Sequence, residues 1–548
     1  MTDKNGDLAF LPLGGTGEIG MNLNLYRSGG SWLAVDCGIG FGGGDMPEVE
    51  VMMADPAFIA ERRDRLRGLV ITHGHEDHVG AVAHLWRALR CPVYATPFTA
   101  AVLRRKLSEA MLLDQVPVHV IPPGGSIDLA PFAISFIRMA HSIPEAQALA
   151  IRTPQGTVLH TGDWKLDPTP LVGPPTDEAA LQRLGDEGVL AMVCDSTNAL
   201  VDGTSGSEAE VRRSMVPLIR DLTGRVAVTC FATNVARVET IAKAAEEAGR
   251  HVAIVGRSLR NITAAARETG YLRDVPEFVD EDDAGSIPDE NLLLIVAGSQ
   301  GEPRSALARI AADTHPNIAL GEGDTVIFSS RVIPGNERAI ATVQDNLTRR
   351  GIRVMTDADH MVHVSGHPAK DELRRLYRLV RPRFAVPTHG EWRHLSEHAT
   401  LGREMGATPI IVENGDIVRL APGTPEIVDS APTGRLALDG NRLVPVGGEV
   451  LAARRRMLFN GVVMASVAVD EAGRVRGTAR ISAPGLLAPE DPEMERVAGE
   501  LAGAIADLPA PVRRDDMALT EAARTLLRRA LGRRLQKRPM VDVHLLRV

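Results

Sequence analysis

The sequence is poor in cysteine and in aromatic residues and has no long hydrophobic run, and each of these absences excludes a class of protein. Its 548 residues include four cysteines without a CxxC pair, which argues against a zinc ribbon or a disulfide scaffold and favours a reducing cytoplasm. Aromatic residues make up 3% of the chain, too few for a long base-stacking groove. No run approaches the roughly 18 apolar residues of a membrane span, and the polar residues 1–7 have no signal-peptide core. We therefore expect a cytoplasmic protein of about three or four structural units that does not contact a membrane.

Positive charge is also scarce overall, because the formal net charge is −9. This weakly disfavours nucleic acid as a partner, but a binding site is local. Residues 519–536 form a predicted helix near the end of the chain that carries five arginines. We interpret it as a solvated helix face, with a partner or nucleic-acid surface as the alternative. The five are Arg524, Arg528, Arg529, Arg533 and Arg534.

Hydrophobic periodicity divides the chain into a strand-rich first part and an alternating second part. The strands predicted in the first part are residues 31–37, 68–72, 157–161 and 189–194, and a helix is predicted at 79–89. From residue 225, strands and helices alternate with short connections up to residue 355, which predicts a parallel sheet covered on both faces. Residues 421–446 contain four prolines and are expected to be a linker. Paired strands at 461–469 and 474–481, helices at 494–507 and 519–536, and a strand at 541–548 form a small final unit.

Three loops at the predicted carboxyl ends of the parallel strands are rich in glycine, hydroxyl and amide residues. They are residues 231–234, 298–303 and 329–336. Such loops suit an anion held by backbone N–H groups at helix N-termini. Ordinary helix capping explains the same composition, and the sequence leaves both interpretations open.

The strongest chemical signal is the segment His73-Gly74-His75-Glu76-Asp77-His78, which directly follows the strand at 68–72. Residues two apart in an extended turn point the same way, so His73 and His75 can bind one ion. Asp77 and His78, at the start of the next helix, can face a second ion. Imidazole and carboxylate ligands without sulfur suit zinc or manganese.

Three further ligand-type residues stand where a predicted strand gives way to a loop: His141, Asp163 and His389. Each alone is more typical of a capping or loop residue. Together with the segment at 73–78 they predict a site that gathers ligands at the open end of a sheet.

These motifs resemble the metallo-β-lactamase superfamily and, within it, the β-CASP nucleic-acid hydrolases of the ribonuclease J family. Beyond the segment at 73–78, the resemblance rests on residues 14–22, 298–303, 333–337, the HVSGH motif at 363–367 and the PTHGE motif at 387–391. It implies an α/β fold class. The expected architecture is an αββα sandwich interrupted by a parallel β-CASP domain and followed by a small C-terminal α/β domain. The implied lactamase domain consists of residues 1–207 and, after the insertion, residues 369–445, which include a linker. The implied β-CASP domain is 208–368, and the implied C-terminal domain is 446–548.

The resemblance also assigns roles to individual residues. His73, His75 and His141 would hold one divalent ion, Asp77, His78 and His389 the other, and Asp163 would bridge them; the ions would be Zn²⁺, with Mn²⁺ as the alternative. Asp36 would orient the site. Asp195 and His367 match the acidic and histidine motifs, with His367 as the general acid. The expected pocket for an RNA 5′-phosphate consists of His363, Val364, Ser365, Gly366, His367, Ser330, Thr233 and Asn234.

The implied reaction is 5′→3′ hydrolysis of 5′-monophosphorylated single-stranded RNA, with internal cutting when the main domains part, in mRNA decay and rRNA maturation. A homodimer or higher homo-oligomer is expected. Two segments depart from the family: Glu145-Ala146 replaces an aspartate-serine pair, and residues 329–332 differ from a serine-proline form. Both departures concern substrate preference. The rivals are a DNA nuclease, a small-molecule hydrolase on the same metal site, and an inactive RNA-binding subunit.

Overall fold

The computed structural model describes residues 6–42, 46, 49–333 and 335–548. The first residues of the chain and Pro334 of the motif at 333–337 lie outside these ranges. The described residues form two compact units: the first contains residues 6–42 and 49–436, and the second contains Ala437–Val548 together with Met46. Each is described by itself.

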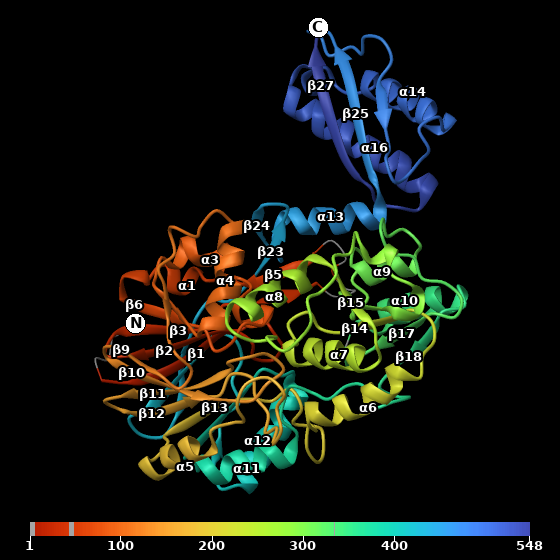
Figure 1. The fold of residues 1–548 in the computed structure, drawn as a ribbon. Helices are drawn as coiled ribbons and strands as arrows, with labels where there is room; N and C mark the ends of the chain where they lie inside the picture. Colours follow the sequence, from red (N-terminus) through yellow and green to blue (C-terminus); the bar gives the residue numbers. More distant parts are fainter. Residues whose placement is uncertain (1–5, 43–45, 47–48, 334) are drawn as a thin grey trace. The chain divides into compact units, whose positions relative to one another are not determined.

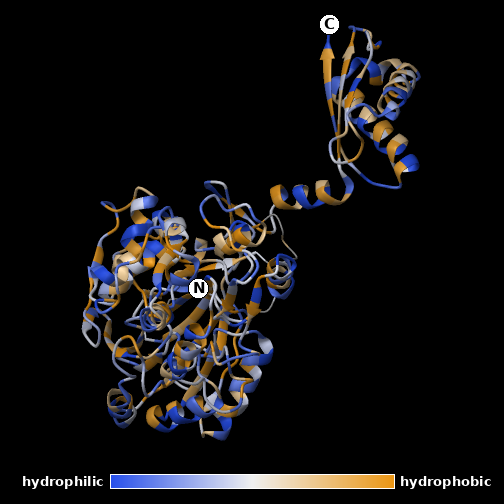
Figure 2. Cartoon of the chain, turned by 45° about the vertical axis from the view of Figure 1, so that its right-hand side comes forward, coloured by the Kyte–Doolittle hydropathy of each residue, from blue (hydrophilic) through white to orange (hydrophobic). Residues whose placement is uncertain are grey.

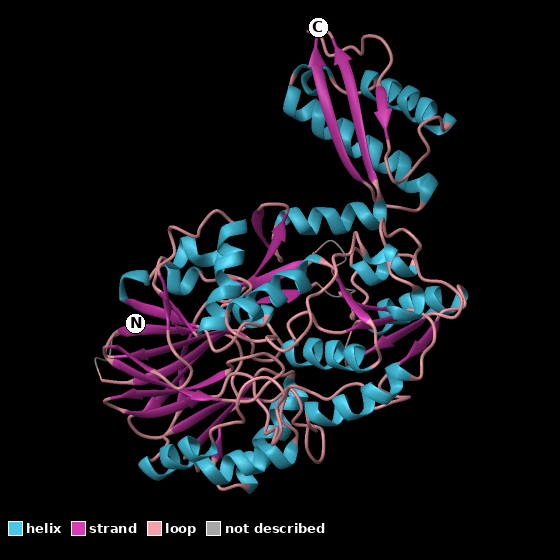
Figure 3. Ribbon diagram, in the orientation of Figure 1, coloured by secondary structure: helices cyan, strands magenta, loops and turns pink. Residues whose placement is uncertain are grey.

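Two large sheets form the centre of the first unit (Figures 1 and 3). The first sheet has, in spatial order, β22 (Glu426–Ser430), β21 (Asp416–Ala421), β1 (Leu8–Gly14), β2 (Leu23–Ser28), β3 (Ser31–Val35), β6 (Leu66–Val70), β7 (Val93–Ala95) and β8 (Val118–Val120). The second has β20 (Thr408–Pro409), β19 (Phe384–Thr388), β13 (Ala191–Asp195), β12 (Gly156–His160), β11 (Gln147–Thr153), β10 (Phe132–Arg138) and β9 (Ser126–Leu129). Phe10 and Tyr26 of the first sheet share one buried core with Phe136 and Leu149 of the second, so the sheets pack face to face.

Helices cover the outer faces of both sheets, which completes an αββα sandwich. The elements beside the first sheet are α1 (Ala57–Ala60), α2 (Glu76–Val79), α3 (Val82–Leu89), α4 (Pro97–Glu109) and the hairpin of β4 (Ile39–Phe41) and β5 (Val51–Ala54). Those on the second sheet are α5 (Glu178–Glu187), α11 (Lys370–Val380) and α12 (Trp392–Glu404). Leu376 and Tyr377 of α11 pack with Leu181 of α5 and Met192 of β13 in a second buried core.

A separate five-stranded parallel sheet interrupts the sandwich, as the alternating pattern predicts. Its order is β15 (His251–Val255), β16 (Leu292–Val296), β14 (Val226–Thr229), β17 (Thr325–Phe328) and β18 (Arg353–Met355). The helices of this region are α6 (Glu208–Arg220), α7 (Val235–Glu247), α8 (Arg257–Glu268), α9 (Ala306–Ala311) and α10 (Glu337–Arg349). Its central strands β14, β16 and β17 are mostly apolar and are buried at every residue, because a parallel sheet covered on both faces is buried throughout. Figure 2 shows that many helices of the chain, by contrast, carry both hydrophobic and hydrophilic residues.

The second unit has a small sheet with helices on one side. Its elements are β24 (Arg442–Pro445), α13 (Glu449–Asn460), β25 (Val462–Val469), β26 (Arg480–Ser482), α14 (Pro492–Ala506), α15 (Ala510–Arg514), α16 (Asp516–Leu535) and β27 (Met540–Arg547). Leu519, Leu527 and Leu531 of α16 are buried, while Arg534 pairs with Glu493 and Glu500 of α14. The arginine-rich helix thus has an apolar inner face, and two of its five arginines, Arg524 and Arg534, form ion pairs with acidic residues of this unit.

Two expectations about local structure are wrong. Residues 421–446 are not an unstructured linker, since they contain β22, β23 (Arg435–Asp439) and β24. β22 pairs antiparallel with β21, although all five of its residues are exposed. The strand expected at 474–481 is limited to β26, with one further bridge between Val469 and Val475.

Candidate metal centre

The segment 73–78 crosses from a buried strand to a short helix at the edge of the sandwich. β6 ends at Val70, and His75 is the residue before α2. His73 and His78 are buried, and the ring centroids of these two histidines are 4.0 Å apart. A Cβ on Gly74 would lie 3.4 Å from Cδ1 of Ile143 and 3.5 Å from Cε1 of Phe98, which is van der Waals distance. These two side chains therefore pack against the turn.

The structure brings His73, His75, His141 and Asp163 together in one group. Nδ1 of His75 lies 3.0 Å from Nε2 of His73 and 3.0 Å from Nε2 of His141. Oδ2 of Asp163 lies 3.8 Å from Nε2 of His73 and 3.9 Å from Nε2 of His141. Tetrahedral zinc with bonds of 2.0–2.1 Å needs donor atoms about 3.3 Å apart. These spacings bracket that value, so the four donors fit one divalent cation.

A second group contains Asp77, His78, His389 and again Asp163. Oδ2 of Asp77 lies 3.1 Å from Nε2 of His389 and 3.5 Å from Nε2 of His78. Oδ2 of Asp163 lies 3.2 Å from Nε2 of His78. The donor atoms of this group all lie within 4.8 Å of one another. The same carboxylate oxygen of Asp163 therefore belongs to both groups, which suits two neighbouring cations.

Asp36 fixes the orientation of the cluster without joining it. Its Oδ2 lies 2.8 Å from Nδ1 of His78, and its Oδ1 accepts a hydrogen bond of 2.8 Å from the backbone N–H of Thr72. A His78 that donates from Nδ1 keeps Nε2 free as a ligand. The carbonyl of Gly366 lies 2.6 Å from Nδ1 of His141 and selects the same tautomer there.

The protonation of the cluster follows from burial and from its carboxylates. Burial lowers the pKa of His75 to about 4 and that of His73 and His141 well below the ordinary value. These three imidazoles are therefore neutral at pH 7, as metal ligands must be. Burial opposes the charge of His389 too, but Asp163 and then Asp195 and Asp77 outweigh it and raise the pKa of His389 to about 10.

His367 and Asp195 form a pair beside the cluster. Nδ1 of His367 lies 2.8 Å from Oδ2 of Asp195 and 3.8 Å from Oδ2 of Asp163. Burial opposes the charged imidazole, but Asp195 and Asp163 raise the pKa of His367 above its ordinary value. Asp195 ends β13 in the sandwich, while the side chain of His367 keeps 23% of its surface exposed.

Hydrogen bonds join the HVSGH motif to the loop that follows Asp195. Nδ2 of Asn198 donates to Oγ of Ser365 at 2.7 Å and to the carbonyl of His367 at 3.0 Å. Arg331 donates to Oδ1 of Asn198 at 2.9 Å. Gly366 packs so closely on His141 that a Cβ would lie 2.8 Å from Cε1 of that ring. The motif is thus within contact of a predicted metal ligand.

The other residues of the predicted phosphate pocket differ in their contacts and in their exposure to solvent. Oδ1 of Asn234 accepts from the N–H of Arg237, so Asn234 caps α7 with its own side chain. Ser330 and Val364 are buried, and Thr233 and His363 are partly exposed. Capping therefore accounts for the amide of Asn234, and Oγ of Ser365 accepts a hydrogen bond of 3.2 Å from the backbone N–H of His367 within its own motif.

Sequence reasoning missed Arg237, which is fully buried beneath this region. Its guanidinium pairs with Glu208 of α6 at 3.0 Å and donates to Oγ of Ser329 and to the carbonyl of Val362. Its Nη1 lies 3.3 Å from Nδ1 of His363. An arginine four residues before Ile241, on the apolar face of the predicted helix, was the signal that could have revealed it.

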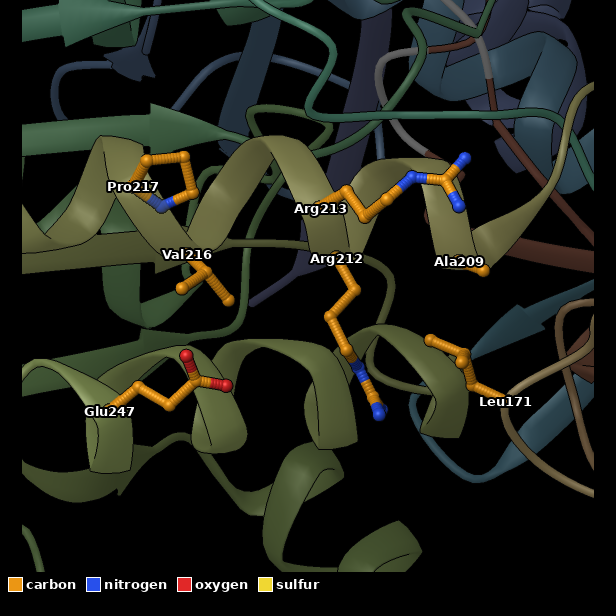
Figure 4. Close-up of a pocket in the computed structure, with 7 residues that line it drawn as sticks. All are labelled: Leu171, Ala209, Arg212, Arg213, Val216, Pro217 and Glu247. Atoms are coloured by element: carbon orange, nitrogen blue, oxygen red, sulfur yellow. The ribbon is translucent and has the colours of Figure 1, made fainter.

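Two hollows accompany these groups. A cavity of about 10 Å³, roughly one water molecule, lies against His78, Asp163, Asp195 and His389. A larger hollow of about 410 Å³ lies between α6 and α7 and is lined by none of the predicted site residues (Figure 4). Its lining residues are Leu171, Ala209, Arg212, Arg213, Val216, Pro217 and Glu247. The predicted site residues therefore line the smaller cavity and not the larger one.

Comparison with known proteins identifies the class. Residues 20–210 match the metallo-β-lactamase superfamily, and residues 351–412 match the RNA specificity domain of Zn-dependent metallo-hydrolases. Residues 223–347 match the β-CASP domain of ribonuclease J, and residues 449–548 its C-terminal domain. The chain is therefore a metal-dependent hydrolase of the metallo-β-lactamase superfamily.

Proteins with similar sequences identify the family within this superfamily. The chain is 44% identical to the ribonuclease J of Sinorhizobium meliloti, over 99% of this chain and 98% of that protein. It is 41% identical to the ribonuclease J of Mycolicibacterium smegmatis, over 98% and 96%. A solved structure of a protein of unknown function from Enterococcus faecalis shares the fold, with a TM-score of 0.51 and 16% identity, over 76% of this chain and all of that chain. This chain belongs to the ribonuclease J family.

Membership confirms the resemblance and the fold class expected from the motifs: a lactamase sandwich with an inserted β-CASP domain and a C-terminal domain. The chain is a metal-dependent hydrolase of RNA, and the DNA and small-molecule alternatives are not favoured. Among the described residues, no helix is both long and apolar enough to cross a membrane.

Proposed function

We propose that the chain removes nucleotides in the 5′→3′ direction from single-stranded RNA bearing a 5′-monophosphate, and cuts internally when the β-CASP and lactamase domains part. The observation that carries this proposal is the position of Asp163, whose Oδ2 is shared by both ligand groups and lies 3.8 Å from Nδ1 of His367. This supports a phosphodiester bound at the two groups with the imidazole ring of His367 beside it.

We infer that His73, His75 and His141 hold one divalent cation, that Asp77, His78 and His389 hold another, and that Asp163 bridges the two. The donor spacings given above support this division. Zn²⁺ is the expected ion, with Mn²⁺ as the alternative, since nitrogen and carboxylate donors suit both. Two cations bound there would acidify a water to a pKa of about 7 and neutralise the phosphate.

His367 is assigned as the general acid. Its Nδ1 faces Asp195, so Nε2 is the atom that delivers a proton to the departing 3′-oxygen. Asp195 holds the imidazole in this tautomer and favours its protonated form. Such a proton transfer contributes about 10²–10⁴ in rate, and the products would be nucleotides with a 5′-phosphate.

The RNA 5′-phosphate is assigned to the pocket of His363, Val364, Ser365, Gly366 and His367, together with Ser330 and the start of α7 at Thr233 and Asn234. The buried Arg237 supports this assignment through position and not through net charge, which Glu208 balances: it donates to the carbonyl of Val362 and lies 3.3 Å from the ring of His363, and so holds the start of the motif in place. A pocket that closes on a chain end excludes internal phosphodiesters, since these have no terminal phosphate to place there.

The domain boundaries, the assembly and the cellular role are also proposed. We infer a lactamase domain at 1–207 and 369–445, a β-CASP domain at 208–368 and a C-terminal domain at 446–548, which the family matches support. We expect a cytoplasmic homodimer or higher homo-oligomer that acts in mRNA decay and rRNA maturation.

The test is a digestion of three matched substrates: RNA with a 5′-monophosphate, the same RNA with a 5′-triphosphate, and the corresponding DNA. We expect mononucleotides from the first substrate far faster than from the other two. His75→Ala is the control that removes a ligand. Equal rates on all three substrates would refute the end preference, and undiminished cleavage by His75→Ala would refute the site.

A further inference from the structure

Glu145 stands at the junction between the metal-ligand loop and the β-CASP domain. It lies four residues after His141, at the first position where the sequence departs from the family pattern. Its backbone has φ of +61°, a left-handed conformation that is costly for a residue with a side chain and that persists only where neighbouring contacts enforce it.

The two carboxylate oxygens of Glu145 bind two different parts of the molecule. Oε2 accepts a hydrogen bond of 2.8 Å from the backbone N–H of Phe98, at the start of α4. Oε1 accepts one of 3.1 Å from the hydroxyl of Tyr271, which lies just after α8. α4 belongs to the region matched by the lactamase superfamily, and Tyr271 to the region matched by the β-CASP domain. One side chain therefore joins the two domains.

Packing continues this connection to both metal-ligand segments. The rings of Phe98 and Tyr271 meet edge to face with centroids 6.1 Å apart. Phe98 is fully buried, and its Cε1 would lie 3.5 Å from a Cβ on Gly74, between His73 and His75. Tyr271 is thus connected to the turn at 73–75 through Phe98, and to the segment of His141 through Glu145.

Two other polar contacts join α4 and α8, and both are expected to contribute less stability than the hydrogen bond between Tyr271 and Glu145. Arg105 pairs with Glu268 at 2.7 Å and Asn261 donates to Glu109 at 3.3 Å, but both contacts are exposed to solvent. Exposed pairs contribute little, whereas the contact of Tyr271 with a carboxylate is partly buried and charge-assisted. Burial and then Glu145 raise the pKa of Tyr271, so its hydroxyl stays protonated and remains a donor.

We propose that the hydrogen bond between Tyr271 and Glu145 is a latch that holds the β-CASP domain closed on the metal-ligand loops and so restricts cleavage to RNA ends. This rests on the proposed function, because it names what governs the balance between end-directed and internal cutting. Tyr271 and Glu145 are positioning residues in this scheme, since neither belongs to the ligand groups.

The first test measures the latch without any catalysis. Hydrogen–deuterium exchange of the full-length protein is compared for the parent, Tyr271→Phe and the control Arg105→Gln. Tyr271→Phe removes one hydroxyl and keeps the ring that packs on Phe98. We expect exchange in residues 266–275 and 96–104 to rise roughly tenfold in Tyr271→Phe and much less in Arg105→Gln. Unchanged exchange in Tyr271→Phe, or an equal rise in both variants, would overturn the latch.

The second test measures the consequence for cleavage. A covalently closed circular RNA has no end, so only internal cutting consumes it, while a linear 5′-monophosphorylated RNA of the same sequence reports end-directed digestion. We expect the ratio of circular to linear cleavage to rise roughly tenfold in Tyr271→Phe. A ratio equal to the parent's overturns the proposed control. If the parent digests neither RNA, the proposed function fails, and the exchange measurement still decides the latch.

Discussion

Nδ1 of His78 lies 2.8 Å from Oδ2 of Asp36, and both side chains are buried. Asp36 itself is held by Thr72, whose backbone and hydroxyl both donate to it. The carboxylate therefore fixes which nitrogen of His78 faces the cation site. Mutation of a residue that orients a ligand in this way typically lowers metal affinity by about 10–100-fold.

Asp36→Asn is expected to weaken the binding of Zn²⁺ or Mn²⁺ by about 10–100-fold, because the amide no longer enforces the tautomer of His78. Calorimetric titration of the metal-free protein measures this. Asp128→Asn, an exposed aspartate on β9, is the control and should bind like the parent. Equal affinity in Asp36→Asn and the parent would contradict the role given to Asp36.

His367→Gln is expected to lower the rate of cleavage by about 10²–10⁴ while metal content stays unchanged. Asp195→Asn should lower it too, and the double variant should be little worse than His367→Gln, because the two residues act as one unit. Single-turnover rates with elemental analysis measure both quantities. Additive losses would show that Asp195 acts independently of His367.

Metal binding is expected to release protons. With a pKa of about 10, His389 holds a proton at pH 7.5 in the metal-free protein, and a bound cation must displace it. Affinity should therefore rise as the pH rises from 6.5 to 8.5. Titrations in two buffers of different ionisation enthalpy give the number of protons released. Identical heats in both buffers would mean that none is released.

His398 makes the stability of the protein sensitive to acid. It is buried between Oγ of Ser196 and the hydroxyl of Tyr377, and burial lowers its pKa to about 4. Because the unfolded chain binds a proton near pH 6.5 and the folded chain does not, its contribution is complete above pH 6.5 and is lost as the pH falls towards 4. The advantage of the parent over His398→Gln should shrink by about 2 kcal/mol between pH 7.5 and pH 5. Thermal unfolding at both pH values measures it, and a constant advantage would contradict it.

Arg237→Met is expected to destabilise the protein by about 3–5 kcal/mol, because it leaves Glu208 buried without its partner. The double variant Arg237→Met/Glu208→Met should recover part of the loss. Urea unfolding followed by circular dichroism compares the three proteins. A double variant less stable than Arg237→Met would mean that Glu208 is not the cause.

The sequence predicts most of the sandwich, the parallel sheet and the ligand clusters because each depends on local signals. A buried strand followed within three residues by histidine or aspartate indicates a sheet end, and His73, Asp163 and His389 all fit this pattern. Since carboxyl ends of neighbouring strands meet at one edge, residues far apart in the chain are expected to converge there.

The sequence-based predictions are wrong or incomplete where the structure depends on contacts between distant parts of the chain. β22 pairs with β21 through its backbone while all its side chains are exposed, so its sequence has no apolar alternation. The burial of Arg237 depends on Glu208, Ser329 and Val362, which come from three other parts of the chain. No window around residue 237 contains those partners.

Gly366 has a consequence for the evolution of this enzyme. Its carbonyl orients His141, and the space that its missing side chain leaves is filled by the same ring. On the site assignment proposed above, a mutation that enlarges residue 366 would therefore disturb both the pocket for the RNA terminus and the position of the ligand His141 in a single step. Lineages that acquire a new preference for RNA ends are expected to change the surroundings of this glycine and to keep the glycine itself.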